Sequence, residues 1–367
     1  MVPLIRSSAF PFFPPHPPLW NPLNTPDVFV WILLFTNNGP KAQQLELELK
    51  EYLDVPDLLF LTNGTIALQL AIKALDLKGE IITTPFSYVA TTSSIIWEGC
   101  TPVFVDIDKE TFNIDPTLIE AQITSKTSAI LATHVFGNPC DIDAIDIIAK
   151  KHNLKVIYDG AHAFGVKYKG ESIFNFGDIT TCSTHATKLF HTVEGGFVVS
   201  KNKDLMKRVA FMRNFGHNGP YEYSEVGING KNSELHAAVG LVNLKYIDQI
   251  IKRRKMIFEL YRTKLSNILL FNQKWNNLAS NNFSYYPVLF NSEKDLEKCQ
   301  TVLVEEFIYG RRYFKPSLET IYNLIGENTY CKNSNLVSNK IFCLPFYYEL
   351  PEDKIEKVCQ ILTKLIY

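Results

Sequence analysis

One lysine stands out because of the residues around it. Lys188 lies in the polar and small-residue run STHATK (residues 183–188), between two apolar, strand-like segments of DITTCSTHATKLFHTVEGGFVVS (residues 178–200). A lysine placed there, away from any charged helical face, is a candidate for covalent chemistry through its amine. Most lysines simply face solvent. Lys188 therefore becomes informative only if the other parts of a site accompany it.

The tripeptide Asn63-Gly64-Thr65 opens a segment with helical periodicity. Glycine lets the backbone approach an anion closely, a helix start offers unpaired N–H groups, and the Thr65 hydroxyl adds a donor. A phosphate group fits such a place. An ordinary helix cap explains the same residues, since Asn and Thr both cap helices well.

Further candidates lie in or just after other strand-like segments. Asp159 ends LKVIYD, where a carboxylate at the C-terminal edge of a parallel strand can meet a ligand or cap a helix. Ser183 precedes Lys188 by five residues, and Tyr88 in TTPFSY either meets a ligand or packs in the core. Together these residues supply what pyridoxal phosphate (PLP) needs: a phosphate cradle, an aromatic face, a carboxylate for the pyridine nitrogen and a lysine for the Schiff base.

Short β-rich runs alternate with helical runs along the chain from about residue 59. This alternation predicts βαβ units and a mainly parallel sheet covered on both faces, with ligands at the C-terminal ends of its strands. The expected strands are 80–84, 102–106, 129–135 and 154–159, and helices are expected to begin near residues 64, 90, 115, 141 and 203.

The C-terminal third differs in composition. One long helix is expected from residue 233 to about 265, and then a small α+β unit with a strand at 283–290 and a final helix at 352–367. Residues 1–26 are rich in proline, which favours an extended run. We therefore predict an extended N-terminal segment (1–36), a large PLP-binding α/β domain (37–240), and a linking helix with a small α+β domain (241–367).

Composition excludes several classes of protein. A net charge of −1 over 367 residues, with no extended basic block, argues against a nucleic-acid or anionic-membrane partner. The apolar run 28–35 is too short to span a membrane. The seven cysteines are scattered without a CxxC pair, which favours reduced thiols over disulfides or a metal site. A soluble, cytoplasmic protein is expected.

The chain resembles the DegT/DnrJ/EryC1/StrS family of sugar aminotransferases, which are fold-type I PLP enzymes. The resemblance runs from about residue 36 to 265, with a weaker likeness at 311–314 and 343–345. The motifs that carry it are NGTIALQLA, TTPFSYVATT, PVFVDID, HVFGNPCDID, KVIYDGAHAFG, STHATK, EGGFVVS and GINGKNSELHAA.

The resemblance implies a role for each matching residue. Lys188 stands at the Schiff-base lysine and Asp159 at the partner of the pyridine nitrogen. The other cofactor positions are Gly64, Thr65 and Ser183 at the phosphate, Tyr88 on the ring, His162 near the 3'-oxygen where most of the family has glutamine, and Asn229 at the phosphate of the other subunit's cofactor. A homodimer with two shared active sites is therefore implied.

The resemblance also implies a reaction. The motifs TTPFSYVAT, YDGAHAFG and STHATK are most similar to the branch that aminates C4. The implied reaction moves the amino group of L-glutamate to a nucleotide-linked 4-keto-6-deoxy sugar, converting dTDP-4-keto-6-deoxyglucose to dTDP-4-amino-4,6-dideoxyglucose. Thr184 and Asn232 depart from a frequent aromatic and a frequent methionine, and these changes bear on the substrate pocket.

Other functions remain open at this level. A 3-keto sugar nucleotide aminotransferase of the same family and a non-catalytic relative that binds cofactor or sugar both fit. A sugar dehydratase of the family carries a histidine in place of the lysine, so Lys188 weighs against it. Candidate contacts to the sugar or its diphosphate are the histidines and cations His185, His191, Arg213, Lys231 and Arg312.

Overall fold

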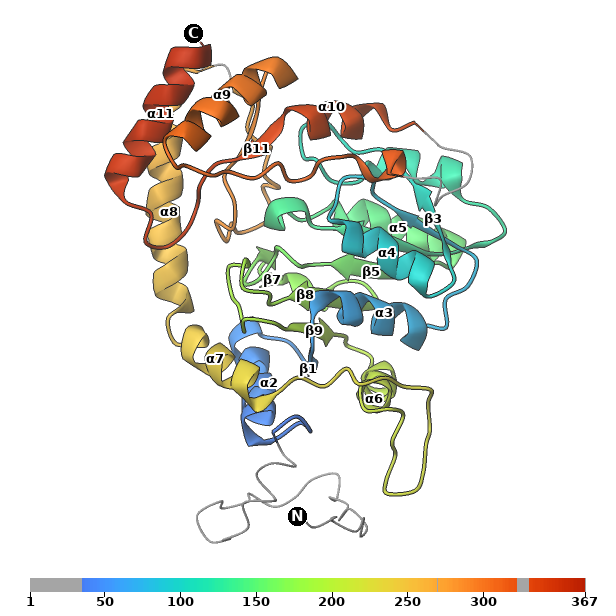
Figure 1. The fold of residues 1–367 in the computed structure, drawn as a ribbon. Helices are drawn as coiled ribbons and strands as arrows, with labels where there is room; N and C mark the ends of the chain where they lie inside the picture. The colour runs from blue at the N-terminus through green and yellow to red at the C-terminus, as the bar shows by residue number, and fades with distance from the viewer. Residues whose placement is uncertain (1–34, 269, 322–329, 367) are drawn as a thin grey trace, which may run out of the picture.

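The computed structural model describes residues 35–268, 270–321 and 330–366. The extended segment expected at 1–36 therefore lies outside the described residues, except for Phe35 and Thr36. The described chain forms a seven-stranded sheet between helices on both faces, joined to a smaller unit that has its own helices and two short strands (Figure 1).

The central sheet is mainly parallel, as the alternation of strands and helices predicts. Strands β8, β5, β4, β2 and β3 run parallel, whereas β9 is antiparallel to both β8 and β1. Strands β8 and β9 are joined by the loop 184–195, which carries Lys188. In spatial order the strands are β1 (Leu58–Leu61), β9 (Gly196–Val199), β8 (Ile179–Ser183), β5 (Lys155–Asp159), β4 (Thr127–Thr133), β2 (Glu80–Thr83) and β3 (Thr101–Phe104).

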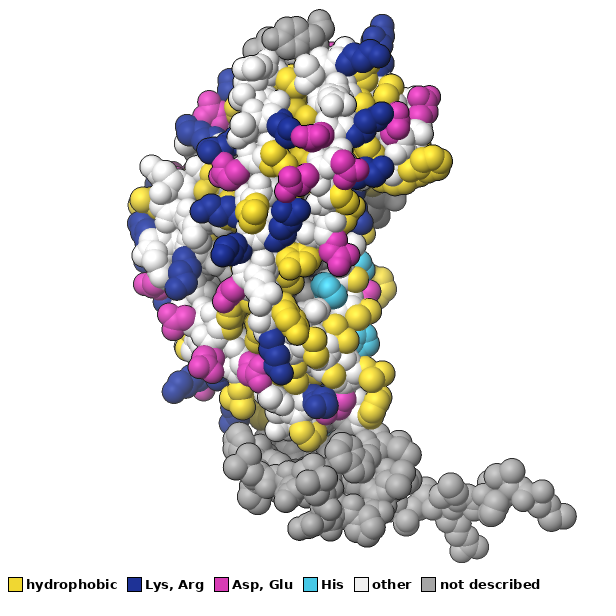
Figure 2. Space-filling model, turned by 90° about the vertical axis from the view of Figure 1, so that its left-hand side faces the viewer, with side chains coloured by type: hydrophobic (Ala, Val, Ile, Leu, Met, Phe, Trp, Pro, Cys, Tyr) yellow, Lys and Arg dark blue, Asp and Glu magenta, His cyan; other side chains and the backbone are white. Residues whose placement is uncertain are grey.

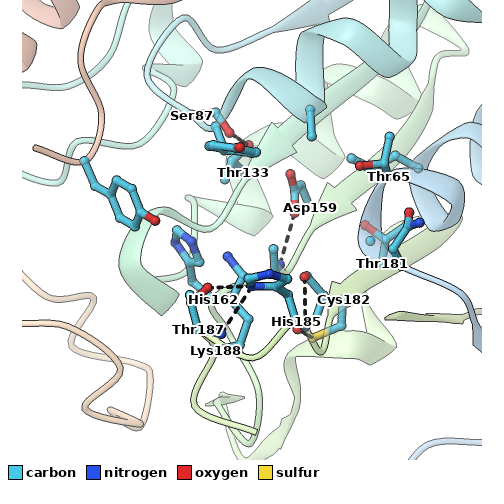
Figure 3. A pocket seen from close by; sticks show the side chains of 18 of the residues that line it. Thr65, Ser87, Thr133, Asp159, His162, Thr181, Cys182, His185, Thr187 and Lys188 are labelled. Atoms are coloured by element: carbon cyan, nitrogen blue, oxygen red, sulfur yellow. Dashed lines mark hydrogen bonds between the residues drawn. The ribbon is translucent and has the colours of Figure 1, made fainter. Parts of the chain in front are cut away.

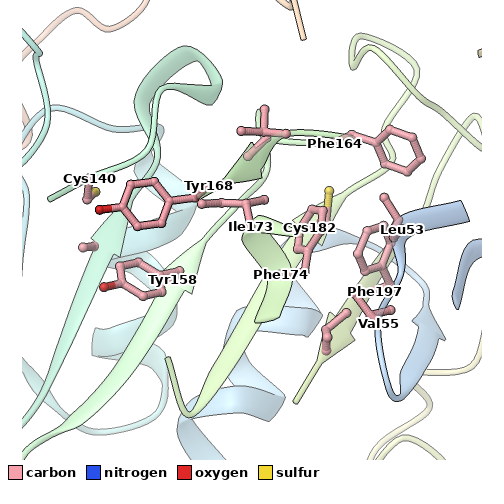
Figure 4. Close-up of a cluster of buried hydrophobic side chains, with 14 of the residues drawn as sticks. Leu53, Val55, Cys140, Tyr158, Phe164, Tyr168, Ile173, Phe174, Cys182 and Phe197 are labelled. Carbon is pink, nitrogen blue, oxygen red and sulfur yellow. The ribbon is translucent and has the colours of Figure 1, made fainter. Parts of the chain in front are cut away.

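Both faces of this sheet are buried. Along β5, Val156 and Tyr158 pack in one hydrophobic core and Ile157 packs in the other, because successive strand residues point to opposite faces. The first core, part of which Figure 4 shows, includes residues of α2 (Pro40–Leu53), α5 (Ile142–His152) and α7 (Glu234–Leu244). The second includes residues of α3 (Gly64–Ala74), α4 (Val89–Trp97) and α6 (Lys203–Met212).

Side-chain caps fix where the helices of the large unit begin. The Asn63 side chain accepts a hydrogen bond of 2.8 Å from the N–H of Ile66 at the start of α3. Asp141 caps α5 through the N–H of Ala144 at 3.1 Å. Each cap satisfies one N–H group that the helix itself leaves unpaired, so these two helix starts, both expected from the sequence, are confirmed.

The smaller unit has a hydrophobic core of its own, which includes Tyr261, Tyr286, Leu296 and Phe342. This agrees with the expected α+β class, although the domain boundaries themselves stay a prediction. Its elements are α8 (Ile247–Lys264), β10 (Pro287–Leu289), α9 (Glu293–Glu305), α10 (Lys332–Lys340), β11 (Ile341–Cys343) and α11 (Glu352–Ile366); β10 and β11 pair antiparallel.

Three sequence expectations are wrong in detail. The single helix expected from 233 to 265 is two helices, because the N–H groups of Lys245 and Tyr246 bond three residues back and tighten the turn between α7 and α8. The helix expected after residue 115 is two short 3₁₀ turns, Pro116–Leu118 and Glu120–Gln122. Only Pro287–Leu289 of the expected strand 283–290 forms a ladder.

Across the described residues, no helix is both long and apolar enough to cross a membrane.

Candidate active site

A pocket of about 370 Å³ opens at the C-terminal ends of β4, β5 and β8, beside the N-terminus of α3. The pocket therefore lies at the edge of the sheet where ligands are expected. The pocket brings together eight residues singled out in the sequence: Gly64, Thr65, Tyr88, Asp159, His162, Ser183, His185 and Lys188. In Figure 3, Asp159 lies between Thr65 and His162, and Lys188 lies near His162 and His185.

The start of α3 forms a place for an anion. Gly64 and Thr65 occupy the first turn of the helix, so their N–H groups have no carbonyl one turn earlier to bond. A Cβ added to Gly64 would lie 2.8 Å from the Cβ of Ser183, so glycine is what lets the helix start approach the end of β8. This backbone corner, with the hydroxyls of Thr65 and Ser183 beside it, can hold a phosphate.

Asp159 is a buried carboxylate at the pocket floor, with 6% of its surface exposed. Its Oδ2 accepts a hydrogen bond from the Thr91 hydroxyl at 2.8 Å, and its Oδ1 accepts one from the N–H of Ala161 at 3.0 Å. Burial raises the pKa of Asp159, and the two hydrogen bonds and the charge of Lys188 oppose that rise. Since neither hydrogen-bond donor is charged, the carboxylate can accept a cationic N–H group from a ligand.

Thr91 belongs to a buried chain of hydroxyls. Ser87 Oγ lies 2.7 Å from Thr91 Oγ1 and 3.1 Å from Thr133 Oγ1. Asp159 is an acceptor when ionised, so the protons of the chain all point toward it, from Thr133 through Ser87 and Thr91. Such chains strengthen their terminal hydrogen bond.

Lys188 is half-buried in the loop between β8 and β9 and lines the pocket. Its backbone N–H donates to the carbonyl of His185 at 2.9 Å, which shapes the turn. Burial lowers the pKa of the amine, while the charge of Asp159 raises it and that of Arg311 lowers it further. A lowered pKa increases the share of neutral amine, which is the form that attacks a carbonyl carbon.

The geometry fixes the protonation of His162, which the sequence leaves open. The N–H of Phe136 donates to His162 Nδ1 at 3.2 Å, so the ring proton lies on Nε2. Burial and the charge of Lys188 hold the pKa of His162 well below its usual value. The ring stacks on Phe314, with centroids 5.6 Å apart and 5° between the planes. His162 is therefore a neutral donor at this wall of the pocket.

The aromatic Tyr88 lines the pocket with 57% of its surface exposed. It is the N-cap residue of α4 and its side chain makes no capping hydrogen bond. The alternative that Tyr88 packs in the core is wrong, and its ring is available to cover a planar ligand.

His185 also lies at the pocket, paired with Glu194. Its Nε2 is 3.4 Å from a Glu194 oxygen, and its Nδ1 accepts from the N–H of Thr187 at 3.2 Å. Glu194 itself also lines the pocket. The two residues form a polar rim next to Lys188.

The other four substrate candidates lie outside this pocket. Arg213 is buried and ion-paired with Glu46. Lys231 donates to Asn214 at 2.7 Å, and His191 lies against Asn243, which donates to the His191 carbonyl at 2.8 Å. Arg312 pairs with Glu293 at 3.1 Å and donates to the carbonyl of Asn339. Each of these residues thus has a polar partner within the chain, and its contact with a substrate stays a prediction.

Two site features were missed from the sequence. Arg311, not Arg312, lines the pocket, together with Tyr313 and Phe314. The hydroxyls of Ser87 and Thr133 support Asp159 through Thr91. The sequence does carry a signal for the arginine. Neighbouring residues of an extended segment point to opposite sides, so only one of two adjacent arginines can face the pocket.

Asn229 also lies outside the pocket. It is exposed on the loop between α6 and α7, and its backbone bridges to Asn214. Its expected reach to a cofactor in the other subunit stays a prediction.

The residues present fit PLP. The buried carboxylate of Asp159 suits a protonated pyridine nitrogen, and the open N–H groups at Gly64 and Thr65 suit its phosphate. Lys188 supplies the amine and Tyr88 an uncovered aromatic face. No group of three or more His, Cys, Asp or Glu side chains within the described part of the chain is arranged to hold a metal ion.

Comparison with known proteins matches residues 33–363 to the model of the DegT/DnrJ/EryC1/StrS aminotransferase family. The likeness therefore extends well beyond residues 36–265. The dTDP-4-amino-4,6-dideoxy-D-glucose transaminase of Shigella dysenteriae is 41% identical over 341 residues, covering 90% of this chain and 92% of that protein. The Escherichia coli enzyme of the same name is 40% identical, covering 89% and 90%.

Solved structures agree. The crystal structure of DesI, described with its TDP-sugar product, has a TM-score of 0.85 and 30% identity, covering 91% of this chain and 86% of that one. A PLP form of the putative sugar aminotransferase Spr1654 from Streptococcus pneumoniae has a TM-score of 0.84 and 26% identity, covering 91% and 94%.

Proposed function

This chain belongs to the DegT/DnrJ/EryC1/StrS aminotransferase family, and we propose that it moves the amino group of L-glutamate to dTDP-4-keto-6-deoxyglucose, making dTDP-4-amino-4,6-dideoxyglucose. It is a PLP-dependent sugar aminotransferase. The main support for the proposal is that Lys188, Asp159 and the N-terminus of α3 line the same pocket. The proposed sugar, and the carbon that is aminated, are taken from the names of the two transaminases at about 40% identity.

Each pocket residue then has a task. PLP, when bound, supplies an electron-withdrawing ring that lets a proton leave the carbon bearing the amino group. Lys188 Nζ takes the proton from the α-carbon of glutamate in one half-reaction and returns a proton to C4 of the sugar in the other. Asp159 would hold the charge of the pyridine nitrogen, and the Nε2–H of His162 would donate to the 3'-oxygen.

The proposal includes a homodimer in a cytoplasmic setting. Apolar side chains are exposed on α7 and just after it, where Leu235 is 61%, Val242 54% and Tyr246 53% exposed. Figure 2 shows hydrophobic side chains gathered on the lower half of one face of the molecule. A second copy would cover such a surface, and Asn229 would then contact the partner's cofactor phosphate.

Amino transfer tests the function directly. Purified protein with PLP, L-glutamate and dTDP-4-keto-6-deoxyglucose should form 2-oxoglutarate and the 4-amino sugar in equal amounts. Lys188→Ala should fold and dimerise but transfer no amino group. Turnover by Lys188→Ala, or the absence of a cofactor trapped on Lys188 by borohydride in the wild type, would overturn the proposal.

A panel of 3-keto and 4-keto sugar nucleotides separates the remaining alternatives. Preference for a 3-keto sugar would assign the chain to that branch of the family. Binding of cofactor and sugar without turnover would make it a non-catalytic relative, and loss of a hydroxyl without amination would make it a dehydratase.

A further inference from the structure

We propose that Arg311 binds the carboxylate of the amino donor, an assignment that rests on the proposed function. Arg311 is exposed and lines the pocket together with Lys188, Tyr313 and Phe314. It comes from the segment that bridges to Cys343 and not from α3 or β8, so it offers the pocket a cation in addition to the phosphate corner made by Gly64 and Ser183.

The backbone holds Arg311 firmly while its side chain remains available. The N–H of Arg311 donates to the carbonyl of Cys343 at 3.0 Å, and the N–H of Cys343 donates back at 2.7 Å. The guanidinium donates one hydrogen bond, from Nη1 to the Tyr313 hydroxyl at 2.6 Å, and lies over the Tyr313 ring at 5.5 Å. Within the described ranges it forms no ion pair, whereas Arg312 pairs with Glu293.

Tyr313 therefore orients the guanidinium, and the remaining N–H groups can face an anion. A planar guanidinium matches the two oxygens of a carboxylate in a bidentate pair. Among the described residues that line the pocket, Lys188 is the one lysine and Arg311 the one arginine. A donor carboxylate would otherwise enter this pocket without a fixed cation.

Position favours the donor carboxylate over the sugar diphosphate. Arg311 and Lys188 line the same pocket of about 370 Å³, and the charge of Arg311 adds to the effect of burial, which is the main cause of the lowered pKa of Lys188. The α-carboxylate of an amino acid is bonded to the carbon that must react beside Lys188. In a 4-keto sugar nucleotide the diphosphate is attached at C1, across the ring from the reacting C4. The donor therefore brings its charge nearer to Lys188 than the sugar does.

The two half-reactions separate these ligands. Arg311→Met should lower kcat/KM for the glutamate half-reaction by about 30-fold or more, since loss of a charged partner costs about 2 kcal/mol or more. The half-reaction with dTDP-4-keto-6-deoxyglucose should stay within about threefold of wild type. Tyr313→Phe, which removes only the hydroxyl that orients the guanidinium, should show a smaller loss in the same half-reaction. Both half-reactions are followed by the absorbance of the cofactor in single-turnover mixing.

Equilibrium binding gives a readout that does not depend on turnover. Calorimetry with 2-oxoglutarate on PLP-loaded protein should show binding lost in Arg311→Met and retained in part in Arg311→Lys, while dTDP binding is unchanged. Weakened dTDP binding, or equal losses in both half-reactions, would assign Arg311 to the diphosphate or to the fold and overturn the inference. A wild type that transfers no amino group would instead refute the proposed function.

Discussion

The Thr91 hydroxyl donates a hydrogen bond of 2.8 Å to Asp159 Oδ2, and it does so from the first turn of a helix. Thr91 lies on α4, three residues after the exposed Tyr88, whereas Asp159 ends β5. The bond therefore ties the helix that presents the aromatic face to the strand that presents the carboxylate. Behind it, Ser87 and Thr133 complete a buried chain of hydroxyls.

The first prediction concerns this bond. Thr91→Val keeps the shape of the side chain but leaves Asp159 Oδ2 without its hydroxyl donor, so the pKa of Asp159 should rise further. A hydrogen bond to a charged group contributes about 1.5–3 kcal/mol, so PLP affinity should fall by about tenfold or more. Fluorescence titration of the cofactor-free protein measures this. Thr91→Ser, which keeps the hydroxyl, should bind nearly as wild type, and equal affinities in all three proteins would contradict the role of the bond.

The second prediction concerns the pH dependence of Lys188. The amine reacts when neutral, and burial lowers its pKa from 10.5 in spite of the opposing charge of Asp159. The rate at which cofactor-free protein captures PLP should therefore rise with pH, with a midpoint below that value. Asp159→Asn removes a charge that raises the pKa of Lys188, so the midpoint should move to lower pH. Stopped-flow absorbance over a pH series measures both, and a midpoint that moves upward in Asp159→Asn would be inconsistent with the pairing.

Much of this site could be predicted from the sequence, because the residues next to each main site residue indicate the start of a helix or the end of a strand. Gly64 and Thr65 follow a capping residue, and Asp159 ends a strand whose apolar run is plain in the sequence. Parallel strands bring their C-terminal ends to one edge, so residues far apart in the chain meet there. The positions of these residues depend on whether a segment is a helix or a strand and on which way it runs, and local sequence patterns predict both.

The arginines could not be assigned in the same way. Arg311 and Arg312 are adjacent in the sequence. Which of them faces the pocket depends on the bridge between Arg311 and Cys343, a residue of β11 that lies about 30 residues further along the chain. The break between α7 and α8 likewise depends on tertiary packing, because Lys245 and Tyr246 carry no helix-breaking signal. Long-range register and packing, not local propensity, set these features.

The third prediction tests the assignment of Arg213 to the structure instead of the substrate. Arg213 pairs with Glu46, donates to the carbonyl of Phe60 at 3.0 Å, and is 6% exposed. Arg213→Met should leave Glu46 as an uncompensated buried charge and cost about 3–5 kcal/mol of unfolding free energy. Urea denaturation measures the loss, and Glu46→Gln/Arg213→Met should recover part of it. A raised KM for the sugar nucleotide in folded Arg213→Met, with stability unchanged, would restore the substrate role.

The fourth prediction tests whether two subunits share each site. Asn229 is exposed and lies outside the pocket that holds Lys188 of its own subunit, so its expected contact with a cofactor phosphate requires a partner. Lys188→Ala should be inactive and Asn229→Ala should bind PLP weakly. In a mixed dimer of the two variants, one site would combine an intact Lys188 with an intact Asn229 from the opposite subunit. Random mixing should then restore about a quarter of wild-type activity at limiting PLP, since half of the dimers are mixed and each has one complete site. If Asn229 serves its own subunit, every site in the mixed dimer carries a defect, and mixing should restore nothing above the sum of the separate variants.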